Sequence, residues 1–252
     1  MGATMGMLCG RISEETPKHT VVKAGAGFEI RRYAPSVCAT TAYASAEMGK
    51  DAGGPFGLLA RYIGVFSDAQ NRAPGGQGAE KIAMTAPVLM GPAGGAPEAA
   101  AAGGGGGGGG EQAPMLAEGA AALLTDGRGS LSFLLPAKYG SVAEAPVPTD
   151  SRIVLRQLPE RTEAVATFTW ALSEANIRTH LVQLLADLAD DDEWQAAPAT
   201  ATASEGEGDG GSLLEPRQVQ WTAAGFNPPF TLPWWKTNEV MTAVVRRKAS
   251  RL

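Results

Sequence analysis

The clearest pattern along the chain is an amphipathic stretch that begins at Ser173. Apolar residues recur there at the i, i+4, i+7 and i+8 spacing of one helix face, and polar residues occupy the other positions. The apolar face consists of Ile177, Leu181, Leu184, Leu185 and Leu188. Serine is favoured immediately before a helix because its hydroxyl accepts a hydrogen bond from a free backbone N–H. The pattern therefore predicts a helix that begins after Ser173 and packs its leucine face on a sheet.

A second helical pattern runs from Pro55 to Asp68, with proline in the first turn, where a missing N–H is tolerated. One continuous arc about 160° wide carries the large apolar residues, which is typical of a core-facing helix. These residues are Leu58, Leu59, Tyr62, Ile63, Val65 and Phe66. The opposite side is a strip of minimal side chains with larger neighbours at its edges: Gly57, Ala60 and Gly64, then Phe56 and Arg61.

Glycine inside a helix costs about 1 kcal/mol relative to alanine, so two of them indicate that something closely approaches the backbone. A flat apolar ligand is one interpretation. Another strand or a flexible segment could equally cover the strip, or Gly64 could simply end the helix. If the ligand were a flat macrocycle with acid side chains, basic residues could bind the acids and aromatic residues could cover the ring. The candidates are Arg61, Lys236, Phe56, Trp234 and Trp235, although the paired tryptophans could instead belong to the core.

Segments rich in β-branched and aromatic residues flank both helical patterns. They cover residues 28–33, 37–43, 81–90, 130–135, 152–158, 162–170, 218–223 and 239–245. The order strand, helix, strand therefore occurs twice along the chain. Strands that surround two helices in this way predict an α+β domain.

Two segments of low complexity interrupt this pattern, at residues 91–124 and 196–211. The first contains an unbroken glycine run from Gly103 to Gly110, and the second is rich in Ala, Thr, Gly and Glu. Such segments cannot bury enough apolar surface to offset the entropy lost on ordering. We therefore predict a single domain over residues 11–250 with flexible insertions at these two places.

Composition and charge exclude several classes of protein. A net charge of -5 and a pI near 5.2 leave no cationic surface for nucleic acid. Cys9 and Cys38 form neither a disulfide framework nor a C-x-x-C metal motif, which favours a reducing compartment. No apolar run reaches the roughly 18 residues of a transmembrane segment, and the first residues lack the pattern of a secretory signal. These features predict a cytoplasmic protein.

Signals of catalysis are missing from the sequence. It has no His, Cys and Asp constellation, no H-E-x-x-H motif and no phosphate-binding glycine motif next to a strand. The acidic residues between Asp187 and Glu193 could bind a divalent cation, but they lack an alternating ligand loop and are more typical of a solvated helix end. We therefore predict a protein that is not an enzyme.

Four segments resemble one known family. Residues 15–18 read ETPK, followed by FEIRRYAP at 28–35, KIAMTAPV at 81–88 and FNPPFTLP with NEV at 226–240. In this order they resemble the SOUL heme-binding protein family, most closely its plant and algal cytosolic-type members. The resemblance implies a distorted, mostly antiparallel β-barrel with two long helices, built as a pseudo-twofold repeat of βαβ-type halves.

The resemblance also implies non-catalytic, non-covalent binding of heme or another tetrapyrrole in a shallow hydrophobic groove along the first helix. Such a protein acts as a carrier, buffer or scavenger, and a chloroplast-associated location is an alternative to the cytoplasm. The matching groove positions are Phe56, Gly57, Ala60 and Arg61, where larger apolar residues are usual in the family. Gly64, Trp234, Trp235 and Lys236 complete the predicted ligand-binding set. The groove could alternatively bind a partner helix or an apolar peptide.

The resemblance does not supply an iron ligand. Some family members have been proposed to use a histidine at the position of Arg32, so this ligand is absent here. His19 and His180 are more typical of structural or solvated residues. Met48, Met84 and Tyr62 could ligate iron in principle, but the sequence does not reveal their geometry. We therefore assign no metal ligand.

Overall fold

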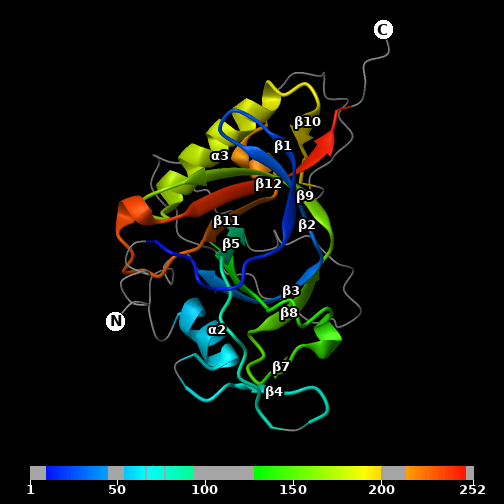
Figure 1. Ribbon diagram of the computed structural model, residues 1–252, viewed down its shortest axis with the longest axis vertical. Coiled ribbons are helices and arrows are strands. Elements are labelled where there is room, and N and C mark those ends of the chain that lie inside the picture. The colour runs from blue at the N-terminus through cyan, green and yellow to red at the C-terminus, as the bar shows by residue number, and fades with distance from the viewer. Residues whose placement is uncertain are drawn as a thin grey trace, which may run out of the picture.

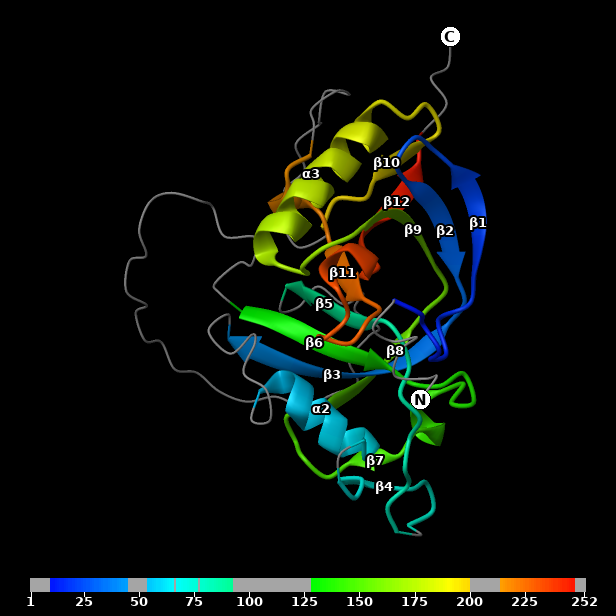
Figure 2. The ribbon, with the colours of Figure 1, turned by 60° about the vertical axis from the view of Figure 1, so that its left-hand side comes forward.

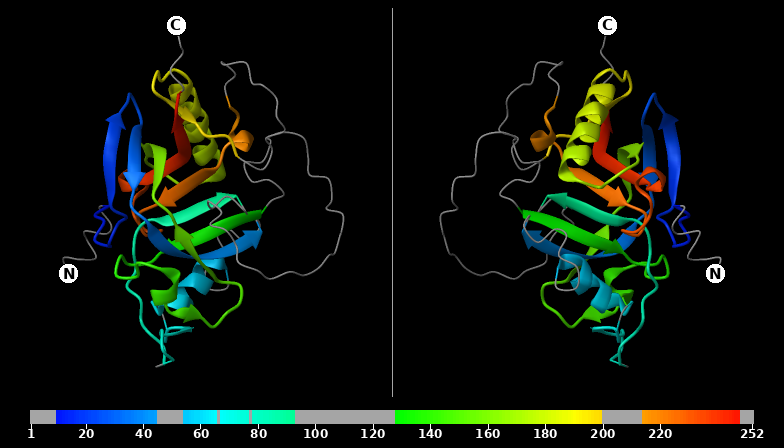
Figure 3. Two further views of the ribbon diagram at one scale, coloured as in Figure 1. Left: turned by 90° about the vertical axis from the view of Figure 1, so that its right-hand side faces the viewer. Right: turned by 90° about the vertical axis from the view of Figure 1, so that its left-hand side faces the viewer.

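The computed structural model describes residues 10–44, 54–65, 67–76, 78–92, 128–199 and 214–247. In this part of the chain, ten strands form one curled antiparallel sheet, and two α-helices lie at its opposite ends (Figures 1 and 3). The predicted α+β class is thus confirmed.

The order of strands across the sheet differs from their order in the chain. From one edge to the other run β1 (His19–Ala24), β2 (Glu29–Tyr33), β9 (Arg161–Phe168), β12 (Asn238–Arg246), β11 (Trp221–Gly225), β5 (Val88–Pro92), β6 (Arg128–Leu134), β3 (Ser36–Ala44) and β8 (Val154–Leu158). β10 (Trp194–Ala196) pairs with β12. Neighbouring strands are antiparallel, and the sheet curls into a half-barrel with β1 and β8 at its ends (Figure 2).

Shorter elements lie outside this sheet. β4 (Asn71–Arg72) and β7 (Val147–Pro148) form a separate two-stranded sheet. Among the described residues, three short 3₁₀ helices lie in the connections, namely η3 (Val142–Glu144), η5 (Pro216–Gln218) and η6 (Pro233–Trp235).

Helix α3 (Glu174–Ala189) covers the half of the sheet that contains β9 and β12. Its core contacts include Ile30, Ala164 and Val240, which project from the strands toward the helix. The helix residues that share this core are Ile177, Leu181, Leu184, Leu185 and Leu188, as predicted from their spacing. The Ser173 hydroxyl accepts a hydrogen bond of 3.3 Å from the backbone N–H of Asn176, so the predicted N-cap is confirmed.

Helix α2 (Pro55–Ile63) covers the other half of the sheet and packs on β3 and β6. Its buried apolar side chains are Leu58, Leu59, Tyr62 and Ile63, and they share a second core with Val37, Ala39, Leu131 and Phe133. The helix is shorter than predicted because Gly64 adopts the left-handed conformation (φ 79°) and ends it. Neither α2 nor α3 is long and apolar enough to span a membrane.

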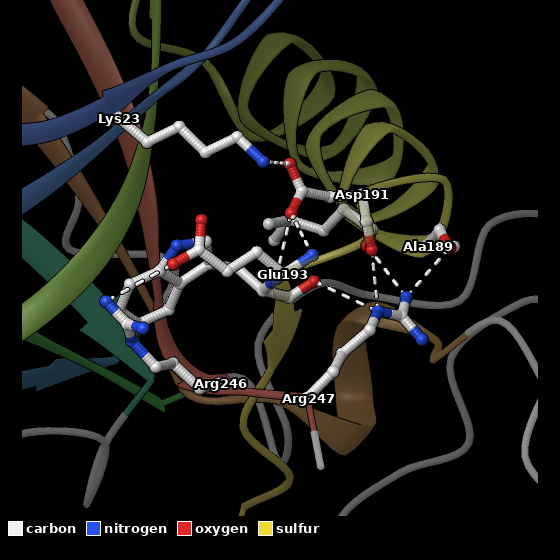
Figure 4. A network of polar contacts seen from close by, with 8 residues as sticks. Lys23, Ala189, Asp191, Glu193, Arg246 and Arg247 are labelled. Carbon is white, nitrogen blue, oxygen red and sulfur yellow. Dashed lines mark hydrogen bonds and ion pairs between the residues drawn. The ribbon is translucent and has the colours of Figure 1, made fainter. Parts of the chain in front are cut away.

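Polar contacts hold the C-terminal end of α3 to neighbouring strands (Figure 4). The guanidinium of Arg247 donates to the carbonyl oxygens of Leu188 at 3.1 Å and Ala189 at 2.8 Å. Lys23 of β1 forms an ion pair of 2.6 Å with Asp191, just beyond the helix. The last carbonyl groups of a helix have no partner within it, so a cation at this end supplies one and complements the helix dipole.

Three sequence predictions need correction. Residues 81–87 are not a strand, because β5 begins only at Val88. The predicted insertion bounds also overlap ordered structure, since Gly91 and Pro92 belong to β5 and Ala196 belongs to β10. Most of both predicted insertions, residues 93–124 and 200–211, lies outside the described residues.

Candidate functional site

The small-residue strip predicted on α2 is not an open surface. Gly57, Ala60 and Gly64 are all buried, and Ala60 is only 1% exposed. Of the alternatives that the sequence left open, the one in which Gly64 ends the helix is correct. Contact between a ligand and Gly57 or Ala60 stays a prediction. It requires the residues that cover these two positions to move.

Gly64 is needed for both its conformation and its neighbours. Its backbone N–H donates to the carbonyl oxygens of Ala60 and Arg61, and a Cβ atom there would lie 2.9 Å from the Cβ of Ala69. We expect Gly64→Ala to lower the free energy of unfolding by about 2–3 kcal/mol, because it adds a steric clash to the roughly 1–2 kcal/mol penalty of positive φ. Urea denaturation measures this change.

The matched control is Gly75→Ala. Gly75 also has a positive φ, of 88°, but nothing lies within 4 Å of a Cβ built on it. The control therefore carries only the backbone penalty of about 1–2 kcal/mol. Equal losses in the two variants would show that the close approach of Ala69 contributes nothing.

The edges of α2 are accessible in part. Phe56 is half-buried and packs edge-on against Phe133, with ring centroids 5.3 Å apart. Arg61 is also half-buried and lies near Asp150. Hydrogen bonds from Arg152 lower the pKa of Asp150 to about 2, and the charge of Arg61 contributes to this shift. The Asp150 carboxylate, which binds Arg152, therefore also compensates part of the charge of Arg61.

The predicted residues near the end of the chain occupy a turn with exposed aromatic rings. Trp234 is 53% exposed and Trp235 is 45% exposed, so neither belongs to the core. Lys236 follows them and is half-buried. Two further aromatic residues, Phe230 in the same turn and Trp170 two residues after β9, are each 58% exposed. We call Trp170, Phe230, Trp234 and Trp235 the aromatic turn.

Hydrogen bonds fix the conformation of this turn. The Asn227 side chain donates to the carbonyl oxygen of Gly10 at 3.0 Å and accepts from the backbone N–H of Thr237 at 2.6 Å. The N–H of Trp235 donates to the carbonyl oxygen of Leu232 at 2.9 Å. A Cβ atom on Gly10 would collide with the carbonyl oxygen of Trp235, so the N-terminal segment approaches the turn closely. The exposed rings are therefore carried by an ordered backbone, which limits the entropy lost when a ligand binds.

Trp170 joins the turn through its backbone. Its N–H donates to the carbonyl oxygen of Pro233 at 2.8 Å, and its own carbonyl accepts from the Asn238 side chain at 3.0 Å. These bonds hold Trp170 at a φ of 76°, which is rare for a bulky residue and persists only where the surrounding structure imposes it. The sequence contains no signal of this conformation, because it arises from contacts with residues more than 60 positions away.

The side chains considered as iron ligands have other contacts. The ring of His180 stacks on Phe168 with centroids 4.3 Å apart, and burial lowers its pKa. His19 lies 5.2 Å from the ring of Tyr33. The Tyr62 hydroxyl is buried and donates to the carbonyl oxygen of Pro146 at 2.8 Å. Met84 packs against the second core, and Met48 lies outside the described residues.

No group of three or more His, Cys, Asp or Glu side chains that could hold a metal ion occurs in the part of the chain that the structure describes. Three of the acidic residues near the end of α3, namely Asp187, Asp191 and Glu193, are engaged in protein contacts. Asp191, for example, pairs with Lys23 and accepts from the backbone N–H groups of Glu193 and Trp194.

Comparison with models of known families matches the SOUL heme-binding protein family over residues 14–243. The chain therefore belongs to the SOUL heme-binding protein family, as the four sequence segments predicted. A search of curated proteins finds no match.

Three solved structures are similar to this chain at low identity. The C-terminal domain of EcmrR is 7% identical over 87% of this chain and 98% of that one, with a TM-score of 0.41. A hydrolase from Listeria innocua is 8% identical over 92% and 94%, with a TM-score of 0.40. A transcription regulation protein, so described, from Staphylococcus aureus is 10% identical over 87% and 99%, with a TM-score of 0.33.

Proposed function

We propose that this protein binds heme and related tetrapyrroles without catalysing a reaction, as a carrier, buffer or scavenger. Membership of the SOUL heme-binding protein family supports the class of ligand. The observation that carries the proposal is the exposed pair Trp234 and Trp235, which lies beside Lys236 on an ordered turn. Soluble proteins rarely gather large exposed aromatic side chains except at a binding site.

The chemistry of the aromatic turn suits a planar amphipathic ligand. Indole rings stack on other aromatic rings, and such contacts are worth roughly 0.5–1.5 kcal/mol each beyond the area that they bury. The ammonium group of Lys236 can pair with an acid side chain of the macrocycle. Phe56 and Arg61 on α2 remain a second candidate contact, because each is accessible in part.

Neither histidine lies on the aromatic turn or on α2. We therefore propose that affinity comes from burial of the macrocycle and from one or two ionic contacts, with a dissociation constant of roughly 0.01–1 µM. A site of this kind accepts metal-free and metal-bearing macrocycles alike, since none of its proposed contacts selects the metal.

The test is an optical titration of the purified full chain with hemin and with protoporphyrin IX. We expect a shifted Soret band with hemin, quenched tryptophan fluorescence with both ligands, and affinities within about tenfold of each other. A preference for hemin above about a hundredfold would contradict the proposed mode and require an iron ligand.

Variants separate the two candidate faces. We expect Trp234→Ala combined with Trp235→Ala to weaken hemin binding about tenfold or more, because two stacking surfaces are lost. Val182→Ala, which removes a 43% exposed apolar side chain from α3, is the control and should bind hemin normally. Arg61→Glu tests the α2 face. Ala60→Trp is not a usable probe, because a buried residue replaced by tryptophan overpacks the core.

The hemin titration and the variants also test the alternative function, in which the protein binds another protein. A module that binds a partner helix or apolar peptide would use the exposed rings equally well. In that case the purified protein would show no Soret shift with hemin at micromolar concentration. Normal hemin binding by both the double tryptophan variant and Arg61→Glu would instead show that the macrocycle lies elsewhere.

A further inference from the structure

The inner face of the curled sheet, which points away from both helices, carries a cluster of charged side chains. Side chains alternate between the two faces of a strand, so Ile30 and Ala164 contact α3 while their neighbours point inward. On β2 and β9 the inward residues include Arg31, Arg161 and Glu163, with Arg31 directly opposite Glu163. A charged cluster on a buried face needs complete pairing or a ligand, because an uncompensated buried charge is costly.

Arg31 is well paired in this cluster. Its guanidinium donates to Glu239 at 2.8 Å, to Glu29 at 2.7 Å and to the hydroxyl of Tyr33 at 3.4 Å. Burial, together with the charge of Glu239, raises the pKa of Tyr33 to about 12, so its hydroxyl keeps its proton.

Arg161 is poorly paired by comparison. Its contact with Glu163 is long, 3.3 Å from Nε to Oε2, although the two side chains are only 14% and 12% exposed. Within the described residues, Nη1 of Arg161 and Oε2 of Glu163 are buried without a hydrogen-bond partner. The guanidinium also lies 4.9 Å from the ring centre of Tyr33, a contact that satisfies no N–H group. Buried donors without partners are rare in folded proteins and call for an explanation.

The protonation behaviour of Glu163 weakens its pairing with Arg161 further. Burial raises the pKa of its carboxyl group, the neighbouring Glu239 acts in the same direction, and Arg161 opposes them. A carboxyl group that holds its proton more tightly compensates the charge of Arg161 less well. The Arg161 guanidinium is therefore a buried cation that pairs only weakly with Glu163.

A pocket of about 220 Å³ opens beside this guanidinium. Its apolar and aromatic lining includes Tyr33, Leu89, Phe226 and Met241, which suits a ligand with an apolar body. The pair of Arg31 with Glu239 and the side chain of His19 line it as well. Because Arg31 and Glu239 compensate each other, Arg161 is the lining cation whose pairing is incomplete. Its volume is below the roughly 300–1,000 Å³ of pockets for drug-sized ligands, and a tetrapyrrole macrocycle is larger still.

We propose that this inner pocket binds a small organic carboxylate with an apolar body, whose carboxylate group accepts hydrogen bonds from the Arg161 guanidinium. Arginine offers a planar fork of donors that matches a carboxylate group. The apolar body lies against Leu89, Phe226 and Met241. None of the four rings of the aromatic turn lines this pocket, although Phe226 and Thr237 at the base of the turn do, and the proposal does not depend on tetrapyrrole binding.

Isothermal titration calorimetry of the full chain tests the proposal with 3-phenylpropionate and its neutral analogue 3-phenylpropanamide. The two probes have the same body and nearly the same shape, so only the charge of the head group differs. We expect the carboxylate to bind at least about tenfold more tightly than the amide. Equal affinities, or no binding of the carboxylate at millimolar concentration, would overturn the proposal and leave a bridging water as the partner of Arg161.

Two variants should change affinity in opposite directions. We expect Arg161→Met to weaken binding of 3-phenylpropionate about 10- to 100-fold, since a charge-assisted hydrogen bond is lost. Glu163→Gln should strengthen it by up to about threefold, because the guanidinium loses its weak competing ion pair with Glu163. If Arg161 and Glu163 formed only a structural ion pair, the two variants would not change the affinity in opposite directions. Weaker binding in Glu163→Gln would contradict the assignment.

Further controls keep the test decisive. Arg152→Met removes an exposed arginine, 66% accessible, that does not line the pocket, and it should leave binding unchanged. Far-ultraviolet circular dichroism checks that each variant is folded, and the comparison of the two probes on the unaltered protein holds even if Arg161→Met unfolds. Displacement of the carboxylate by one equivalent of hemin would overturn the claim that the two sites are separate.

Discussion

Replacing Arg31 with methionine is expected to lower the free energy of unfolding by about 3–5 kcal/mol, as is typical when one partner of a buried ion pair is removed. Arg31 and Glu239 are only 12% and 8% exposed and lie 2.8 Å apart. Without the guanidinium, the carboxylate of Glu239 stays buried without its cation, and the Tyr33 hydroxyl loses a donor. Urea denaturation followed by circular dichroism measures the loss.

Two comparisons show whether the buried charge is the cause. Glu239→Gln added to Arg31→Met should restore roughly half of the lost stability, because no uncompensated carboxylate then remains at this position. Arg152→Met breaks an ion pair with Asp150 in which the arginine is 66% exposed, and it should cost no more than about 1 kcal/mol. A loss in Arg31→Met as small as that in Arg152→Met would contradict our description of the inner face.

Leu184→Ala is expected to lower the free energy of unfolding by about 2–5 kcal/mol, because it removes a completely buried side chain and leaves a cavity. Leu184 is 0% exposed and lies in the core between α3 and the sheet. The control on the same helix is Val182→Ala, at a residue that is 43% exposed, and it should change stability by about 0.5 kcal/mol or less.

The same pair of variants tests how far the two halves of the sheet cooperate. α3 and α2 belong to different apolar cores, but one continuous sheet joins the halves. We expect Leu184→Ala to retain a single urea transition at a lower midpoint. A second transition, with the α2 half unfolding separately, would show that each core is stable by itself.

Local patterns predicted most of the elements correctly. The leucine face of α3, its serine cap, and the strands β2, β3, β6, β9 and β12 all follow from periodicity and residue type, because burial on one face imposes a repeat that can be counted. The failures occurred where a local pattern was ambiguous. Gly64 fits both a helix interior and a helix end, and the region before Val88 is rich in strand-forming residues yet forms irregular structure.

The candidate site was predicted less completely than the fold. Trp234, Trp235 and Lys236 were identified from their chemistry, but their exposure was not, because a tryptophan suits a core and a binding surface equally well. Gly57 and Ala60 were expected to form a bare strip, yet both are buried. A helical pattern shows which residues share a face and does not show what covers that face.

The amino-acid sequence by itself determined the family, the α+β class, the core face of α3 and the aromatic character of the final turn. It determined the core face of α2 only in part, because Val65 was expected in the core and is 36% exposed beyond the end of the helix. Only the tertiary structure decided which of these residues reach solvent, that Trp170 joins the turn, and that Arg161 and Glu163 meet on the inner face with incomplete pairing. The physical reason is the range of the interactions. Periodicity and capping act between residues a few positions apart, whereas exposure and charge pairing depend on strands that the curled sheet brings together from distant parts of the chain.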